Sequence, residues 1–204
     1  MITIIDFGMG NLGSIQNMLR RMDCEVEITS ELDKIQNAEK IILPGVGAFD
    51  MAMSNLQNMG VIPILNDKVL NEKVPILGIC LGMQLLSSRS EEGVREGLDW
   101  IESDTIRFSF TEKQNLRIPH MGWNTVQIEQ DSCLFNDMYE EPRFYFVHSY
   151  HVKCKNTENI LTSTEYGINF TSSIIQGNIY GVQFHPEKSH KFGMKLLRNF
   201  AELC

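Results

Sequence analysis

The sequence predicts an α/β protein with a mostly parallel central sheet flanked by helices, and three observations support this. Short apolar runs such as Ile2–Phe7 and Lys40–Gly45 alternate with stretches of helical spacing, the pattern of parallel βαβ units. These runs are continuously apolar, so we expect strands covered on both faces. From Trp100 to Thr171, short strands and turns dominate, which predicts a more antiparallel, strand-rich second half.

The individual elements follow from local spacing and turn residues. In the first half, strands are expected at 2–7, 25–29, 40–45 and 74–79, and helices at 12–22, 49–59, 62–71 and 81–89. In the second half, strands are expected at 105–110, 124–128, 143–152, 160–167, 172–177 and 179–187, and an amphipathic helix at 190–204. We expect the second-half strands to continue the same sheet. No linker, low-complexity tract or repeat divides residues 1–204, so a single domain is expected.

Composition and charge exclude several classes of protein. The net charge of −8 and the pI near 5.1 argue against a nucleic-acid-binding protein, which usually carries a basic face. The stretch Met1–Gly8 lacks the charged leader of a signal peptide. No apolar run approaches the ~18–20 residues that a membrane span needs. We therefore expect a cytoplasmic protein.

The cysteines give a second indication of compartment. The five cysteines are widely spaced and form no CxxC pair: Cys24, Cys80, Cys133, Cys154 and Cys204. This pattern favours a reducing cytoplasm over a disulfide framework, and it offers no zinc cluster. No metal or organic cofactor is implied. Apart from Cys80, we expect these residues to be ordinary buried cysteines.

The stretch GICLG, residues Gly78–Gly82, has the form Gly-x-nucleophile-x-Gly between an apolar strand and a helical run. In such an elbow the nucleophile sits on a sharp bend, and the glycines let strand and helix approach closely. The helix N-terminus favours the thiolate of Cys80, and the Leu81 N–H can cradle an oxyanion. The alternative is a buried core cysteine at the end of a strand.

A thiol nucleophile needs a base, and the base needs a group that orients it. Of the five histidines, only His185 has a carboxylate at a suitable local spacing, in HPE. Pro186 favours extended backbone at His185, and residues two apart in an extended chain point to the same side. His185 and Glu187 can therefore meet, leaving one ring nitrogen to face Cys80. The alternative is an ordinary turn after a strand.

The carboxyl ends of parallel strands are where function gathers in such sheets. ILPGVG is one such end, and Gly45 and Gly47 free the backbone to turn an N–H of the Gly45–Val46 peptide toward an oxyanion. The alternative is a plain glycine turn. Gln84 lies one helical turn after Cys80 and can reach the same pocket; otherwise it is a helix-surface glutamine.

Five motifs occur in one order along the chain: PGVGAF, GICLGMQLL, IPHMGWN, YFVHSY and GVQFHPEKS. With them the chain resembles the class I, triad-type glutamine amidotransferases over essentially its whole length, which implies their flavodoxin-like core. PHMGWN and FVHSY are more specific. They resemble the glutaminase subunits of imidazole glycerol phosphate synthase, the ammonia-supplying half of a histidine-biosynthesis enzyme.

The resemblance implies a role for each site residue. It implies that Cys80 attacks the side-chain amide of glutamine to form a thioester, that His185 shuttles protons and that Glu187 orients His185. The implied oxyanion hole is Gly45, Val46 and Leu81, and the implied glutamine-binding residues are Gly47, Gln84, Ser149 and Tyr150.

The resemblance also implies a partner. In this family, ammonia passes to a (β/α)8-barrel cyclase in a heterodimer, which makes imidazole glycerol phosphate and an aminoimidazole carboxamide ribotide. The positions that match the docking face are Asn11, His120, Met121, Trp123 and Lys188. Without the resemblance, Trp123 is interpreted as core packing and Lys188 as a solvated surface charge.

Other functions remain open at this stage. The stretch EGLDWI, residues Glu96–Ile101, replaces the commoner GLGLIPG and resembles paralogues from surface-glycan clusters, which feed ammonia to a sugar-modifying amidotransferase. A cysteine peptidase-like hydrolase on a related fold is a further hypothesis, and a non-enzymatic scaffold is the last.

Overall fold

The structure is a computed structural model that describes residues 1–111 and 116–204. In its first half, short strands alternate with helices, as the apolar spacing predicts. The elements are β1 Ile2–Ile5, α1 Leu12–Arg20, β2 Val26–Thr29, α2 Leu32–Gln36, β3 Lys40–Gly45, α3 Phe49–Met59, α4 Ile62–Asn66, the π-helical turn η1 Asp67–Asn71, β4 Ile76–Cys80 and α5 Leu81–Leu85.

The second half is rich in strands and ends in one long helix. The elements are β5 Arg89–Ser90, β6 Ser103–Arg107, β7 His120–Thr125, β8 Gln127–Ile128, η3 Cys133–Phe135, β9 Arg143–His148, β10 Tyr150–Cys154, η4 Thr157–Asn159, β11 Ile160–Glu165, β12 Asn169–Gln176, β13 Ile179–Val182, η5 Pro186–Lys188 and α6 His190–Leu203. Within the described ranges, no helix is both long and apolar enough to cross a membrane.

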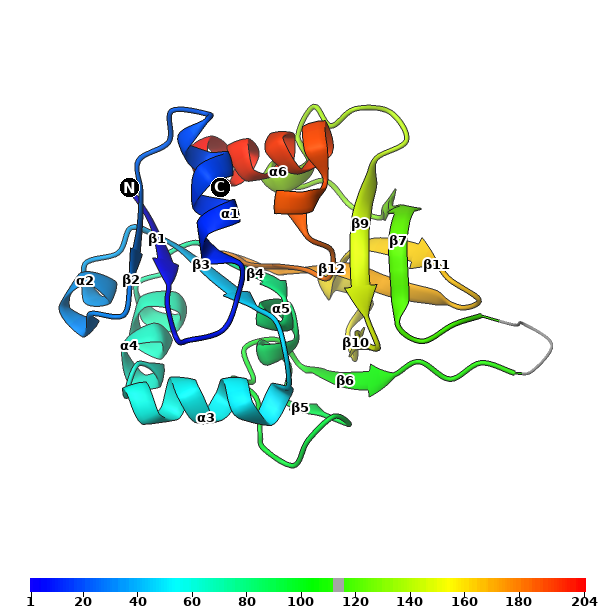
Figure 1. Ribbon diagram of the computed structural model, residues 1–204, viewed down its shortest axis with the longest axis horizontal. Helices are drawn as coiled ribbons and strands as arrows, with labels where there is room; N and C mark the ends of the chain where they lie inside the picture. The colour runs from blue at the N-terminus through cyan, green and yellow to red at the C-terminus, as the bar shows by residue number, and fades with distance from the viewer. Residues whose placement is uncertain (112–115) are drawn as a thin grey trace.

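The main sheet runs in the order β2-β1-β3-β4-β13-β12-β10-β6-β5, with β11 and β8 joined to β12 (Figure 1). Strands β2, β1, β3, β4 and β13 are mutually parallel. From β13 onward the pairings of β12, β10 and β6 are antiparallel. The prediction of an α/β fold with a parallel core and a more antiparallel second half is therefore confirmed.

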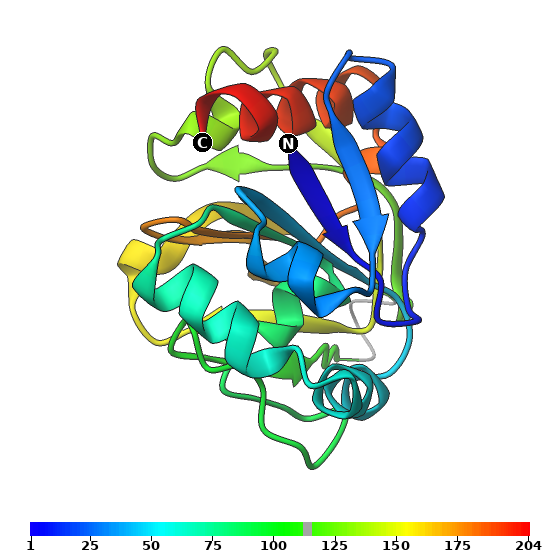
Figure 2. The ribbon, with the colours of Figure 1, turned by 90° about the vertical axis from the view of Figure 1, so that its left-hand side faces the viewer.

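Helices cover both faces of the parallel strands. Figure 2 shows α1 and α6 on one face and α3 and its neighbouring helices on the other. The side chains of β1 divide between these layers. Ile4 packs in the core group that contains Leu19 and Leu197, whereas Ile5 packs in the group that contains Leu56. Because successive strand residues point to opposite faces, a strand buried on both sides must be continuously apolar.

The antiparallel region differs from the expectation that it simply continues the sheet. Strands β7 and β9 form a separate two-stranded sheet, and the single strand expected at 143–152 is split between β9 and β10. The split falls at Ser149, whose carbonyl accepts a hydrogen bond from the Phe108 N–H at 3.1 Å. The helix expected at 81–89 ends at Leu85, and the one expected at 62–71 continues as the π-helical turn.

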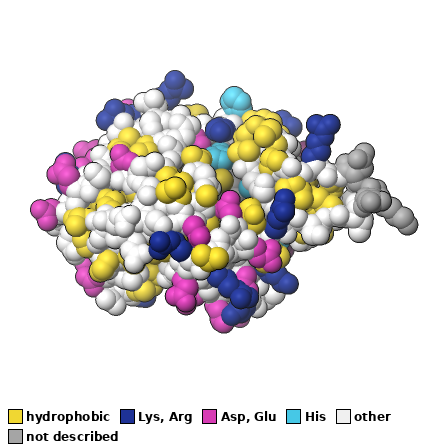
Figure 3. All heavy atoms as spheres, turned by 60° about the horizontal axis from the view of Figure 1, so that its bottom comes forward, with side chains coloured by type: hydrophobic (Ala, Val, Ile, Leu, Met, Phe, Trp, Pro, Cys, Tyr) yellow, Lys and Arg dark blue, Asp and Glu magenta, His cyan; other side chains and the backbone are white. Residues whose placement is uncertain are grey.

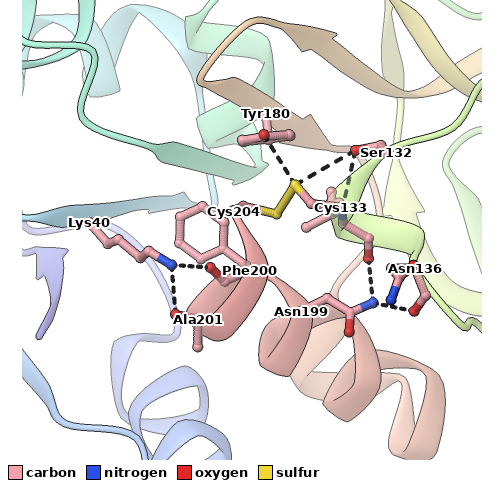
Figure 4. Close-up of a disulfide and its surroundings, with 10 residues drawn as sticks. Lys40, Ser132, Cys133, Asn136, Tyr180, Asn199, Phe200, Ala201 and Cys204 are labelled. Atoms are coloured by element: carbon pink, nitrogen blue, oxygen red, sulfur yellow. Dashed lines mark hydrogen bonds between the residues drawn. A yellow bond between two sulfur atoms is a disulfide. The ribbon is translucent and has the colours of Figure 1, made fainter.

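The structure corrects one expectation about the cysteines. Cys133 in η3 and Cys204 after α6 form a disulfide, although their 71-residue separation and the absence of a CxxC pattern favoured free thiols (Figure 4). Their Cα atoms lie 5.6 Å apart, a usual distance for a disulfide. The hydroxyl of Tyr180 lies 3.2 Å from Cys133 Sγ. This bond joins the last residue of the sequence to the loop between β8 and β9.

Contacts made by α6 explain why these two cysteines meet. Asn199 Nδ2 donates hydrogen bonds to the carbonyls of Leu134 and Asn136, at 3.1 and 2.7 Å. Lys40 Nζ donates to the Ala201 carbonyl near the end of the helix, at 2.6 Å (Figure 4). The helix is therefore held beside η3 by polar contacts that span long sequence distances. Local spacing carries no signal for such contacts.

Candidate active site

Cys80 occupies a strained bend between β4 and α5. Its φ is +56° and its ψ is −109°, a left-handed backbone that L-residues rarely adopt and that clusters at functional sites. Register places it beside the end of β3, where Gly45 pairs with Cys80. Leu81 is the first residue of α5, so its N–H lies among the groups that have no partner within the helix.

Glycines make this bend possible, as the GICLG pattern predicts. A Cβ on Gly82 would lie 1.8 Å from the carbonyl oxygen of Leu43, and a Cβ on Gly78 would lie 2.6 Å from the carbonyl oxygen of Gly82. Strands β3 and β4 and the first turn of α5 therefore approach one another at distances that exclude any side chain at these two positions.

His185 and Glu187 lie in contact after β13. His185 Nδ1 is 2.8 Å from Glu187 Oε1, and the two side chains are 3% and 1% exposed. The backbone of His185 is extended, with φ −103° and ψ 97°, as Pro186 predicts. Its N–H donates to the Tyr145 carbonyl at 2.9 Å. The carboxylate contact fixes the ring, and the second ring nitrogen, Nε2, is buried and has no hydrogen-bond partner among the described residues.

The electrostatics of His185 link it to Cys80. Burial lowers the pKa of the imidazole, but the interactions of the ring with Cys80 and Glu187 outweigh burial and raise this pKa to about 10. At neutral pH the charged imidazolium is therefore the favoured form of the ring. The site therefore holds a proton donor, the imidazolium, beside the candidate nucleophile Cys80.

The other cysteines have no such environment. Burial, followed by the charge of Glu202, raises the pKa of the Cys24 thiol. Burial raises the pKa of Cys154 to about 12. Cys133 and Cys204 are bonded to each other. Cys80 is therefore the cysteine best placed for nucleophilic chemistry.

A cavity of about 350 Å³ opens above Cys80. The residues that sequence reasoning selected and that line this cavity are Val46, Gly47, Cys80, Leu81, Gln84, Ser149, Tyr150, His185 and Lys188. Four further lining residues were missed, namely Glu92, Pro119, Val147 and His148. Glu187 lies behind His185 rather than on the cavity wall. The candidate nucleophile, base, oxyanion and substrate positions thus converge on one hollow from separate parts of the chain.

Gln84 is buried, and its amide orientation is fixed. Its Nε2 donates to the Tyr150 carbonyl at 3.1 Å and to Gln183 Oε1 at 3.0 Å. Both N–H bonds of the amide are therefore used within the protein, and only Oε1 is left to accept a hydrogen bond. The expected reach of Gln84 into the cavity is present, in place of a solvated position on a helix surface.

Gln183 is a site residue that the sequence analysis missed. Its side chain is fully buried, and its Nε2 lies 3.7 Å from Cys80 Sγ, at hydrogen-bonding distance for sulfur. A signal for it was present in the motif, because Gln183 stands two residues before His185 in a run that the sequence predicts to be a strand. Two-residue spacing, which predicts the contact of His185 with Glu187, also predicts Gln183 on the same side as His185.

Three buried histidines, His120, His148 and His151, form what we call the histidine cluster. Burial lowers their pKa values to about 4, about 3 and about 4, respectively, so the rings are neutral. His148 Nδ1 lies 2.7 Å from the Tyr150 carbonyl and must donate to it. His148 Nε2 then accepts from His120 Nδ1 at 3.0 Å, and His120 Nε2 accepts from Asn124 at 3.3 Å.

The expected docking residues divide between two environments. Met121 and Trp123 are 61% and 45% exposed, whereas His120 is 3% exposed. The alternation of β7 explains the difference, since residues 121 and 123 face outward and 120 faces the core. The His120 ring therefore faces the core, and a docking role for this position stays a prediction. Asn11 and Lys188 are exposed. Trp123 stacks on His190 with the ring centroids 5.5 Å apart and an interplanar angle of 3°, rather than packing in the core.

Charge on the surface is mixed. Figure 3 shows acidic and basic side chains interspersed on the face it presents, without a continuous basic patch.

Within the described ranges, no group of three or more His, Cys, Asp or Glu side chains is placed to hold a metal ion.

Comparison with known proteins decides the family. The sequence pattern of the family described as glutamine amidotransferase class-I matches residues 3–203. A Methanococcus maripaludis protein named imidazole glycerol phosphate synthase subunit HisH 2 is 54% identical, over 98% of this chain and 98% of its own length. The chain belongs to the class-I glutamine amidotransferase family, in its HisH branch. A Pseudomonas aeruginosa protein with the same name is 45% identical to this amidotransferase over the full length of both chains.

Solved structures share the fold of this amidotransferase. One, described as a glutamine amidotransferase, matches with a TM-score of 0.71 and 18% identity, over 99% of this chain and 97% of the other. Another, the PurLQS structure from Thermotoga maritima, matches with a TM-score of 0.68 and 16% identity, over 98% of this chain and 96% of the other. At this identity the likeness concerns the fold alone, which is the class I amidotransferase fold.

Proposed function

We propose that this chain is the glutaminase subunit of imidazole glycerol phosphate synthase, and that it hydrolyses glutamine through Cys80, His185 and Glu187. The observation that carries the proposal is the strained Cys80 beside a buried His185–Glu187 pair, at the floor of a cavity of about 350 Å³. The HisH names of its relatives support the same reaction.

The first half-reaction uses the charged pair. The Cys80 thiolate attacks the carbon of the glutamine side-chain amide and forms a C–S bond. The N–H of Leu81 and the Gly45–Val46 peptide stabilise the oxyanion. His185 gives its proton to the departing nitrogen, and the C–N bond breaks. Ammonia leaves, and the acyl group stays on Cys80 as a thioester. Glu187 keeps the ring oriented through both transfers.

The second half-reaction restores the enzyme. Neutral His185 takes a proton from water as the water oxygen attacks the thioester carbon. The C–S bond then breaks, which releases glutamate and returns the thiolate. Gly47, Gln84, Ser149 and Tyr150 bind the glutamine in this scheme. The single acceptor that Gln84 leaves free suits an ammonium group, and glutamine carries one at its α-carbon.

The partner in this proposal is a (β/α)8-barrel cyclase that makes imidazole glycerol phosphate and an aminoimidazole carboxamide ribotide in the cytoplasm. Ammonia is largely protonated in neutral water and is then no longer a nucleophile, so a sheltered route to the second site preserves it. Exposed Asn11, Met121, Trp123 and Lys188 support a docking face beside the cavity, which Lys188 also lines.

The Cys80→Ala variant tests this proposal in the complex with the cyclase. Glutamine-dependent formation of imidazole glycerol phosphate should fall by about 10³-fold or more, while formation with added ammonium salt should stay within about twofold of wild type. Cys24→Ala is the matched control and should keep both activities. Loss of both activities in Cys80→Ala, or retention of both, would show that the site is assigned incorrectly.

A second candidate function uses the same chemistry with another acceptor. The resemblance of EGLDWI, residues Glu96–Ile101, to paralogues from surface-glycan clusters favours a sugar amidotransferase as that acceptor. Mass spectrometry of the aminated product, formed with each candidate partner in turn, distinguishes the two.

A further inference from the structure

Gln183 lies at the reacting sulfur, yet the proposed mechanism gives it no role. It follows β13 directly, and its N–H donates to the Ser172 carbonyl at 2.9 Å, which ties the backbone to β12. Two residues later comes His185, in extended conformation. The chain therefore delivers an imidazole and a carboxamide to the same side of the sheet edge, and both meet Cys80.

Contacts determine which end of the carboxamide faces the sulfur. Gln84 Nε2 has its two N–H bonds directed at the Tyr150 carbonyl and at Gln183 Oε1. A carbonyl can only accept, so Gln84 must present nitrogen there, and Gln183 must present oxygen to Gln84. The Nε2 of Gln183 is consequently the atom that lies 3.7 Å from Cys80 Sγ.

We propose that Gln183 is a catalytic residue that donates a hydrogen bond to the Cys80 thiolate, and that Gln84 is a positioning residue that holds Gln183 in the donating orientation. The inference rests on the proposed glutaminase function and deepens it. A donor to the charged form of a thiol favours that form. His185 faces the sulfur as an ion, whereas Gln183 supplies a neutral donor that stays in place after His185 has given up its proton.

Burial strengthens this role. Gln183 is fully buried and Gln84 is 5% exposed, so little water competes for the hydrogen bond between the two amides. Gln84 lines the cavity and Gln183 does not. Gln183 therefore acts on the sulfur and not on bound glutamine, which predicts a fall in kcat with KM kept within about threefold for Gln183 variants.

The test is the pH profile of Cys80 alkylation by iodoacetamide, followed on the Cys80 peptide by mass spectrometry. The alkylation profile of Gln183→Leu should move up by about one pH unit or more, because a lost hydrogen bond to a charged group disfavours the thiolate by that amount. Below the wild-type midpoint, its alkylation should therefore be about tenfold or more slower. Gln183→Glu keeps the shape of the side chain but places an acceptor beside the sulfur, so Cys80 alkylation should be slower still in this variant. Gln176→Leu, a glutamine on β12 outside the site, should match wild type.

A measurement on the unmodified protein covers the case in which buried variants fail to fold. With ¹⁵N-labelled glutamine, the side-chain amide signal of Gln183 should shift as Cys80 ionises, and the shift should be absent in Cys80→Ala. An unmoved signal, or a folded Gln183→Leu that alkylates at the wild-type rate at every pH, would overturn the proposal. Alkylation needs neither glutamine nor a partner, so its failure is distinguishable from failure of the proposed function.

Discussion

Cutting the Cys133–Cys204 cross-link should lower stability without changing catalysis. The bond closes a loop between residues 71 positions apart. Releasing such a loop returns conformational entropy to the unfolded chain, worth about 4 kcal/mol at 25 °C. A chain of 204 residues has an unfolding entropy of about 0.4 kcal/mol/K, so the melting temperature should fall by about 10 °C. Neither cysteine lines the cavity, so turnover should stay near wild type.

Thermal unfolding of wild type, with and without a phosphine reductant, measures this effect. Cys204→Ser should melt where reduced wild type melts, and should not respond to the reductant. Cys154→Ser, which removes an unpaired thiol, is the control and should keep the reductant response. Equal melting temperatures for oxidised and reduced wild type, with the Cys133–Cys204 bond shown by mass spectrometry to be broken, would refute this prediction.

Three further predictions concern acid stability, the elbow and docking. Each member of the histidine cluster has a native pKa below the unfolded value of about 6.5, so the unfolded state gains protons first as the pH falls. Each of these histidines should then lower the free energy of unfolding by up to about 1.4 kcal/mol per pH unit between pH 6.5 and about 4. A free energy of unfolding, measured in urea, that does not change over this pH range would contradict the prediction. Gly82→Ala forces a Cβ against the Leu43 carbonyl, so its free energy of unfolding should be lower than that of wild type by more than about 3 kcal/mol. The control is Gly13→Ala, whose Cβ meets nothing within 4 Å; urea unfolding should show it equal to or more stable than wild type. Trp123→Ala should weaken binding to the cyclase about 30-fold or more in calorimetry, whereas Tyr139→Ala, equally exposed, should leave it within about threefold.

Much of the fold was predictable because its first half is built from local patterns. Apolar runs indicated β1, β3 and β4, and GICLG indicated the bend at Cys80. His185 and Glu187 were found because two-residue spacing and Pro186 act locally. Each of these inferences depends on interactions within a few residues, which is the range over which sequence pattern reflects geometry.

The errors have different physical origins. The Cys133–Cys204 bond joins residues that lie far apart in the chain, and only the packed fold brings them together. Gln183 is a different case, because its two-residue spacing from His185 is local and was overlooked. The burial of His120 follows from the two-residue period of β7, which turns residues 121 and 123 outward.

The stacking of Trp123 on His190 has a practical consequence for spectroscopy. The protein has two tryptophans, and the other, Trp100, is buried and hydrogen-bonded. A change in solvent contact at the β7 surface therefore alters the fluorescence of Trp123 and leaves that of Trp100 as an internal reference. Tryptophan fluorescence of the unlabelled protein can thus report when another molecule covers that surface and how quickly the molecule dissociates.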